Sequence, residues 1–208
     1  MNIRITRLEQ SLTDQFGSEA SDLAAVIDQC LEKEYTLYAD IDLPVEDKNE
    51  ALLTAFEERA LVPVQKRPSQ GWDSCGLRLT ADESYFIPRV VRILLSTAQE
   101  TGKLDPDQAV RDVLSTCSGS DTGSMADFFA QAKKQVRSFK FEAGLLHQVL
   151  QEMDNPVDLH ASMDTFVLAG MMSPCTGMSV PSGLAWFEVN RCLFWNGPFR
   201  NLSSQNQP

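Results

Sequence analysis

The stretch Ala51-Leu-Leu-Thr-Ala-Phe-Glu-Glu-Arg-Ala-Leu-Val62 decides the fold predicted for the first half of the chain, because its hydrophobic period changes along it. Its apolar residues first recur at helical spacing, which predicts an amphipathic helix over residues 46–60. Beyond it come a short β-branched run, a turn cluster at residues 66–71 and a second run with alternating apolar residues. Residues 61–80 are therefore predicted to form a β-hairpin.

Helical periodicity also precedes and follows this stretch. Apolar residues recur at helical spacing over residues 3–16, where Gly17 ends the run, and again over residues 23–31. A further helix is predicted over residues 85–101, with Pro88 in its first turn, where a missing N–H costs little. The predicted order is thus three helices, a hairpin and a fourth helix.

This order of elements over residues 3–101, with Ala51 to Val62 leading into the hairpin, resembles the winged-helix family. In that family three helices pack together and a β-hairpin forms the wing. The resemblance covers just under half of the chain and implies a winged-helix-like domain over residues 1–104.

The second half of the chain is expected to be a helical domain over residues 105–200, followed by a flexible polar tail over residues 201–208. Asp105-Pro106 has the residue types preferred at a helix start. Three further helical patterns follow, over residues 125–139, 141–153 and 157–172. The predicted fold class is therefore mainly α with a small β-hairpin (α+β).

The charge balance limits the partners of the chain. It carries 29 acidic against 18 basic side chains, a formal net charge of −11, and dividing it at Leu104 yields no basic half. Nucleic acids and anionic membranes are bound through Lys and Arg, so we expect neither as a partner. In the winged-helix resemblance the DNA-contacting helix corresponds to residues 46–59, which hold five acidic side chains against Lys48 and Arg59.

The cysteines indicate the redox environment. The chain has five, far apart and without a Cys-x-x-Cys pair, which favours reduced thiols over a disulfide framework. The opening residues contain no apolar run of signal-peptide length and already reach an acidic residue at Glu9. We therefore expect a cytoplasmic protein.

Residues 165–187 form a run of 23 residues without a charge. The run is long enough to cross a bilayer, but Pro174 and Pro181 would break its hydrogen bonding, and its Gly, Ser and Thr residues reduce the gain from transfer into lipid. We expect it instead to fill the core or to line an apolar pocket.

Four sulfur-bearing residues in and after this run define an alternative site: Met172, Cys175, Met178 and Cys192. Thioether and thiolate ligands suit soft ions such as Cu(I), whereas buried Met and Cys also serve as core filler. A catalytic Cys175 would need a base, for which the chain offers two histidines, His147 and His160.

Taken together, these patterns favour a non-catalytic regulatory or protein-interaction module. A soft-metal- or thiol-dependent sensor or enzyme centred on Cys175 is the first alternative, and a winged-helix transcription regulator is the second. We expect a protein partner and no cofactor, and we leave self-association open. No motif specifies a reaction, so the sequence does not favour an enzyme.

Overall fold

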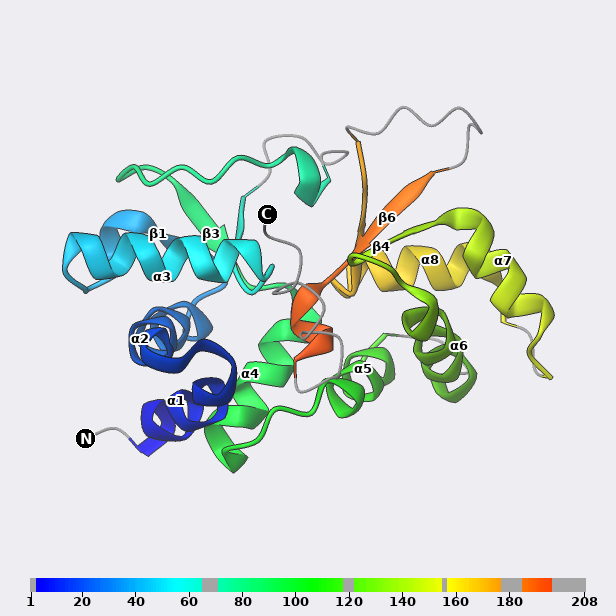
Figure 1. The fold of residues 1–208 in the computed structure, drawn as a ribbon, viewed down its shortest axis with the longest axis horizontal. Helices are drawn as coiled ribbons and strands as arrows, with labels where there is room; N and C mark the ends of the chain where they lie inside the picture. Colours follow the sequence, from blue (N-terminus) through cyan, green and yellow to red (C-terminus); the bar gives the residue numbers. More distant parts are fainter. Residues whose placement is uncertain (1–2, 65–70, 118–121, 155–156, 177–184, 196–208) are drawn as a thin grey trace, which may run out of the picture.

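The structure, a computed structural model, describes the chain in five stretches: residues 3–64, 71–117, 122–154, 157–176 and 185–195. The described part is mainly helical, with two small three-stranded antiparallel sheets (Figure 1). The mainly α fold class is therefore confirmed. We refer to residues 3–104 as the N-terminal half and to residues 105–195 as the C-terminal half.

The N-terminal half begins with two antiparallel-packed helices, α1 (Ile3–Phe16) and α2 (Ala20–Leu31). Both were predicted from their apolar stripes, and the bounds of α1 are those expected. Leu8 and Leu12 of α1 are fully buried. Gly17, with φ of +56°, then takes a left-handed conformation that glycine adopts at low cost, which lets the chain turn toward α2.

The first sheet contains β1 (Thr36–Leu37), β2 (Val62–Pro63) and β3 (Ser84–Phe86), in the order β1-β3-β2. Helix α3 (Val45–Glu57) separates β1 from β2, and α4 (Arg89–Thr101) follows β3. The fully buried Tyr85 anchors the central strand, opposite Thr36 of β1 and Pro63 of β2.

The predicted hairpin over residues 61–80 is wrong in its second strand. Trp72–Ser74 is a single 3₁₀ turn, residues 75–79 are not in a strand, and the strand that pairs with β2 begins only at Ser84. Residues 65–70, which hold most of the predicted turn, lie outside the described residues. The helix expected from residue 85, with Pro88 in its first turn, begins only at Arg89. Pro88 stands at the N-cap position in a non-helical conformation, and the residue before a proline favours extended backbone.

The C-terminal half opens with α5 (Pro106–Ser115) and α6 (Thr122–Gln135). The carboxylate of Asp105 caps α5 by accepting a hydrogen bond from the Gln108 N–H at 2.9 Å, as the Asp-Pro pair predicted. The elements that follow are β4 (Lys140–Glu142), α7 (Ala143–Gln151), α8 (Leu159–Leu168), β5 (Met172–Pro174) and β6 (Trp186–Val189). The sequence did not predict these strands, because runs of three or four residues give too little alternation to detect.

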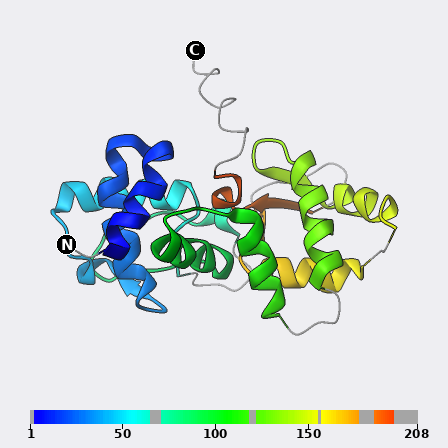
Figure 2. The ribbon, with the colours of Figure 1, turned by 90° about the horizontal axis from the view of Figure 1, so that it is seen from below.

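The two sheets follow one plan. In each half a helix leads into a short strand, helical structure follows, and two further strands complete a sheet in which the last strand is central, in the orders β1-β3-β2 and β4-β6-β5. Helices α4 and α5 pack on each other and lie between the two sheets in the views of Figures 1 and 2.

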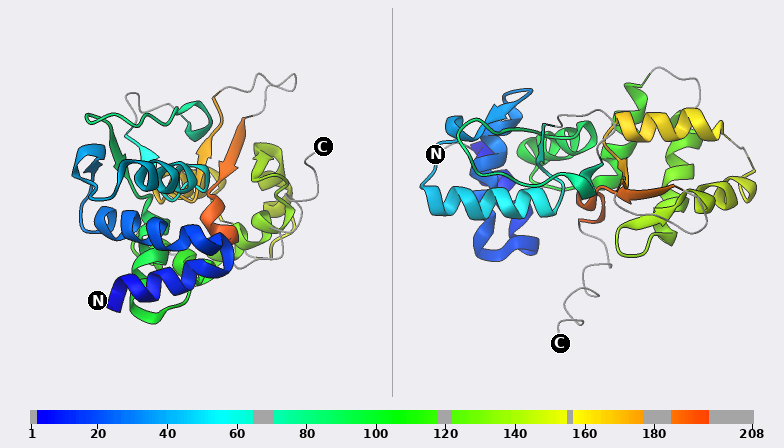
Figure 3. Two further views of the ribbon diagram at one scale, coloured as in Figure 1. Left: turned by 60° about the vertical axis from the view of Figure 1, so that its left-hand side comes forward. Right: turned by 90° about the horizontal axis from the view of Figure 1, so that it is seen from above.

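A continuous core joins the two halves. One cluster of buried apolar side chains runs from α1 to Trp195, so the described residues have no separate N-terminal and C-terminal cores. The last element, the 3₁₀ turn η4 (Arg191–Phe194), lies in the middle of the molecule in both views of Figure 3 and packs on α5. The Trp195 ring stands edge-on to Phe16 of α1, 5.5 Å away between centroids. The division of the chain at residue 104 stays a prediction.

Candidate functional site

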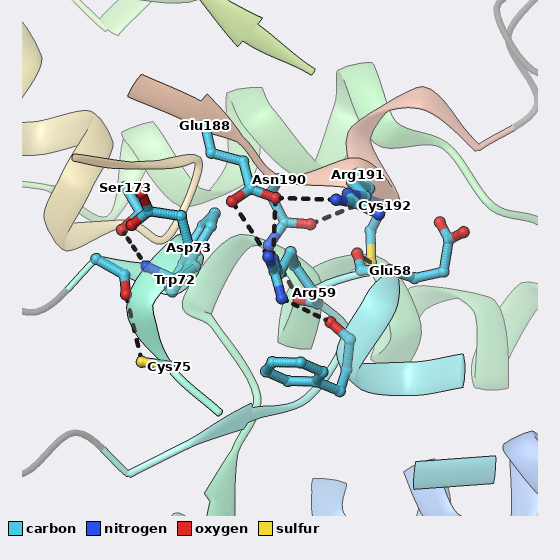
Figure 4. A network of polar contacts seen from close by, with 12 residues as sticks. Glu58, Arg59, Trp72, Asp73, Cys75, Ser173, Glu188, Asn190, Arg191 and Cys192 are labelled. Atoms are coloured by element: carbon cyan, nitrogen blue, oxygen red, sulfur yellow. Dashed lines mark hydrogen bonds and ion pairs between the residues drawn. The ribbon is translucent and has the colours of Figure 1, made fainter. Parts of the chain in front are cut away.

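A buried ion pair lies where the two halves meet (Figure 4). Arg59, just after α3, donates from Nε and Nη2 to the two carboxylate oxygens of Glu188 on β6, at 3.0 and 3.2 Å. The side chains are 9% and 2% exposed. Arg191 reaches the same carboxylate at 3.4 Å, and Arg59 itself has φ of +61°, a left-handed conformation that non-glycine residues rarely adopt.

Polar contacts extend this pair along η4. Asn190 donates from its side chain to the carbonyl of Arg59 at 3.1 Å and accepts from the N–H of Cys192 at 3.0 Å. The Cys192 thiol donates to the carbonyl of Glu58 at 3.3 Å, and the Trp195 indole donates to the Glu58 carboxylate at 2.9 Å. The end of α3 is thus bonded directly to the segment that follows β6.

A second contact joins the segment before β3 to β5. The N–H of Trp72 donates to the hydroxyl of Ser173 at 3.1 Å, and the carboxylate of Asp73 accepts from the N–H of Thr176 at 3.1 Å. Gly71 approaches β5 so closely that a Cβ there would lie 1.8 Å from the carbonyl oxygen of Pro174. Only glycine fits at this position without movement of one backbone.

A third contact joins the start of α4 to the end of α8. The N–H of Val90 donates to the carbonyl of Ala169 at 2.9 Å. Gly170 has φ of +72°, and a Cβ there would lie 2.5 Å from Cβ of Pro88. The three contacts bond the halves at separate places and fix their relative orientation.

Between the second and third contacts lies a groove of about 330 Å³, which we call the junction groove. Its walls come from the residues before β1, the β3–α4 connection, Trp72, the end of α8 and β5. Three of its apolar side chains are unusually exposed: Tyr35 at 53%, Val167 at 38% and Leu168 at 76%. One exposed apolar side chain is ordinary, but several that line the same concave surface are typical of an interaction site.

Two arginines also line the junction groove, and they differ in their contacts. Arg92 donates from both terminal nitrogens, to the carbonyls of Leu31 at 2.6 Å and Lys33 at 2.8 Å. Arg89 is exposed and donates one hydrogen bond, from Nη2 to the hydroxyl of Thr116 at 3.1 Å. Within the described stretches Arg89 forms no ion pair, so most of its donors face solvent.

The described residues of the predicted soft-metal site lie in different surroundings. Met172 is buried on β5, Cys192 is bonded to Glu58, Cys175 follows β5, and Met178 lies outside the described residues. Over the described residues, no group of three or more His, Cys, Asp or Glu side chains could hold a metal ion. A soft-metal site with these ligands stays an untested prediction.

Burial and the neighbouring carboxylate of Asp73 raise the pKa of the Cys175 thiol to about 11. At neutral pH this side chain is therefore a protonated thiol and not the thiolate that nucleophilic catalysis requires. The charged groups that act on it come from Asp73, Lys140, Glu188 and Arg59, with no histidine among them. Cys175 is also not one of the described residues that line the junction groove.

Helix α3, which would contact DNA in the winged-helix resemblance, offers no exposed Lys or Arg. On α3, Lys48 is 7% exposed and donates to the carbonyl of Ile41 at 2.9 Å, while Arg59 beyond its end is held by Glu188. The exposed residues of α3 are Val45, Glu46, Glu50, Leu53 and Glu57. Helix α8 contains neither Lys nor Arg.

Sequence reasoning found part of the junction groove. The uncharged run over residues 165–187 was expected to fill a core or to line an apolar pocket, and its described residues do both: Phe166 is buried, while Leu168 lines the groove. Tyr35 and Arg89 were missed. Tyr35 stands in a polar segment, and Arg89 looks like an ordinary helix residue, so no local pattern marks either of them.

Comparison with known proteins identifies a family to which the chain belongs. A protein-family model matches residues 9–195, which is most of the chain. No curated protein and no solved structure matches the chain. Among the described residues, no helix combines the length and the apolar character needed to cross a membrane.

Proposed function

We propose that this chain, which belongs to the family whose model matches residues 9–195, is a non-catalytic module that binds a partner protein in the junction groove. One observation carries the proposal: apolar side chains from both halves line this groove and are exposed there. When a partner covers an exposed apolar side chain, the complex is stabilised by roughly 25 cal/mol for each Å² of apolar surface that is removed from water.

Several features favour a polypeptide over a reacting small molecule. The described lining contains no Cys or His, and its one serine, Ser173, accepts from the Trp72 N–H in a contact between the halves. Nucleophilic catalysis of the Ser–His or Cys–His type needs a nucleophile with a histidine base in hydrogen-bond reach, and the described lining holds no such pair. Exposed apolar residues beside a concave surface are what a protein partner covers.

We also propose that each half is a winged-helix-like unit used for protein contact. The repeated strand orders β1-β3-β2 and β4-β6-β5, each preceded by helices, support this. The acidic exposed face of α3 and the absence of Lys and Arg from α8 argue against DNA as the partner.

The test is selection of short peptides from a random library on the full chain, followed by affinity measurement against two variants. Leu168→Glu places a charge in the junction groove, whereas the control Leu53→Glu places one on α3, at a leucine that is 47% exposed. We expect peptides whose dissociation constant rises at least about tenfold with Leu168→Glu and stays unchanged with Leu53→Glu. If the dissociation constants of all the selected peptides are unchanged by Leu168→Glu, the groove is not the binding site and the proposal fails.

A further inference from the structure

The junction groove contains an exposed arginine, Arg89, on a backbone segment that adjoins the segment of its most exposed apolar residue, Leu168. Arg89 is the first residue of α4 and Leu168 is the last of α8. The residues that follow them, Val90 and Ala169, share a backbone hydrogen bond of 2.9 Å, so the two side chains start from directly adjoining backbone segments.

The guanidinium of Arg89 is available to a ligand. Its hydrogen bond to Thr116 uses Nη2 alone, which leaves the fork of donors that pairs with a carboxylate largely unused. Arg92, the other groove arginine, is held by two backbone carbonyls. The described lining of the groove holds two arginines, Arg89 and Arg92, against one acidic residue, Glu34. In a chain of net charge −11 this local excess of positive charge attracts an acidic group where most of the surface repels it.

We infer that the partner segment carries an Asp or Glu within a few residues of a bulky apolar side chain, with the carboxylate on Arg89 and the apolar side chain on Leu168. The short spacing follows from the Val90–Ala169 bond, which keeps the two protein groups on neighbouring backbone segments. This inference rests on the proposed function and names the chemistry of the partner. A free inorganic anion fits less well, because it would leave the exposed apolar side chains of the described lining, Val167 and Leu168 among them, in water.

The experiment is a double-mutant cycle between the chain and a selected peptide that depends on Leu168. The peptide is used as selected and with its acidic residue changed to the matching amide, against the wild type and Arg89→Ala. Arg111→Ala, which removes an exposed arginine of α5 outside the groove, is the control. Circular dichroism of each variant checks that it is folded.

We expect the amide change to weaken binding about tenfold on the wild type and on Arg111→Ala, and by less than about twofold on Arg89→Ala. Raising the salt concentration should reduce the wild-type affinity more than that of Arg89→Ala. The inference is overturned if the Leu168-dependent peptides lack an acidic residue. It is also overturned if the amide change weakens binding to Arg89→Ala as much as binding to the wild type. Either outcome leaves the proposed function standing. Absence of any Leu168-dependent peptide overturns both.

Discussion

Arg59 and Glu188, which are 129 residues apart in the sequence, form a doubly hydrogen-bonded ion pair that is buried where the two halves join. A buried charge is costly unless its partner satisfies it, and bidentate geometry specifies how the two groups must approach. The pair therefore fixes how α3 of one half meets β6 of the other. The shape of the junction groove depends on that arrangement.

Breaking the ion pair should destabilise the fold strongly. Glu188→Ala leaves the Arg59 guanidinium without its buried carboxylate, and we expect a loss of about 3–5 kcal/mol in the free energy of unfolding, measured by urea denaturation. The double variant Arg59→Met, Glu188→Leu should lose less than Glu188→Ala, because no charge is left buried. A double variant that loses as much as Glu188→Ala, or more, would contradict this account of the pair.

The close approach of Gly71 to β5 gives a second prediction. In Gly71→Ala the new Cβ would lie 1.8 Å from the Pro174 carbonyl oxygen, so one backbone must move. We expect a loss of about 2–3 kcal/mol in thermal or urea unfolding. Gly76→Ala is the matched control, because nothing lies within 4 Å of a Cβ at Gly76 and its change should stay within about 0.5 kcal/mol. Equal effects at both positions would mean that the contact between residue 71 and β5 is not tight.

Stability should fall at alkaline pH through Cys30. Burial raises the pKa of its thiol to about 11, from an ordinary value of 9.0. Well below pH 9 the thiol is protonated in both the folded and the unfolded chain, and its full contribution to the free energy of unfolding is present. Between pH 9 and 11 the unfolded chain releases the proton first, so the free energy of unfolding falls.

The measurement is urea denaturation across this pH range for the wild type and Cys30→Ala. We expect the wild type to lose up to about 2 kcal/mol more than Cys30→Ala between pH 9 and 11. Cys117→Ala, which removes a less buried thiol, should keep the wild-type pH dependence. Identical slopes for the wild type and Cys30→Ala would rule out Cys30 as the source.

The helices were predictable because their signals are local. The stripe over residues 3–16 ends at Gly17, and Asp105-Pro106 starts α5, so each helix carries its own boundary in adjacent residues. The strands were not, because β1 has two residues and β4 has three, and each is stable only through pairing with residues far along the chain. Pattern reasoning needs longer alternation than these strands provide.

The candidate site was less predictable than the fold. Leu168 lies in an uncharged run together with the buried Phe166, and hydrophobicity does not distinguish a residue that is 76% exposed from one that is buried. The Arg59–Glu188 pair and the backbone bond that brings the Arg89 and Leu168 segments together both arise from contacts between the halves. Sequence spacing carries no information on such contacts without the fold.

The most direct test of the junction groove as the binding site is to map which residues of the chain a bound peptide contacts. Amide NMR spectra of the isotope-labelled full chain, recorded while a Leu168-dependent peptide is added, locate that place residue by residue. We expect the largest shift changes at Tyr35, Leu168 and Gly170, with little change around Leu53. Changes centred on α3, with the groove amides unaffected, would exclude the junction groove as the binding site.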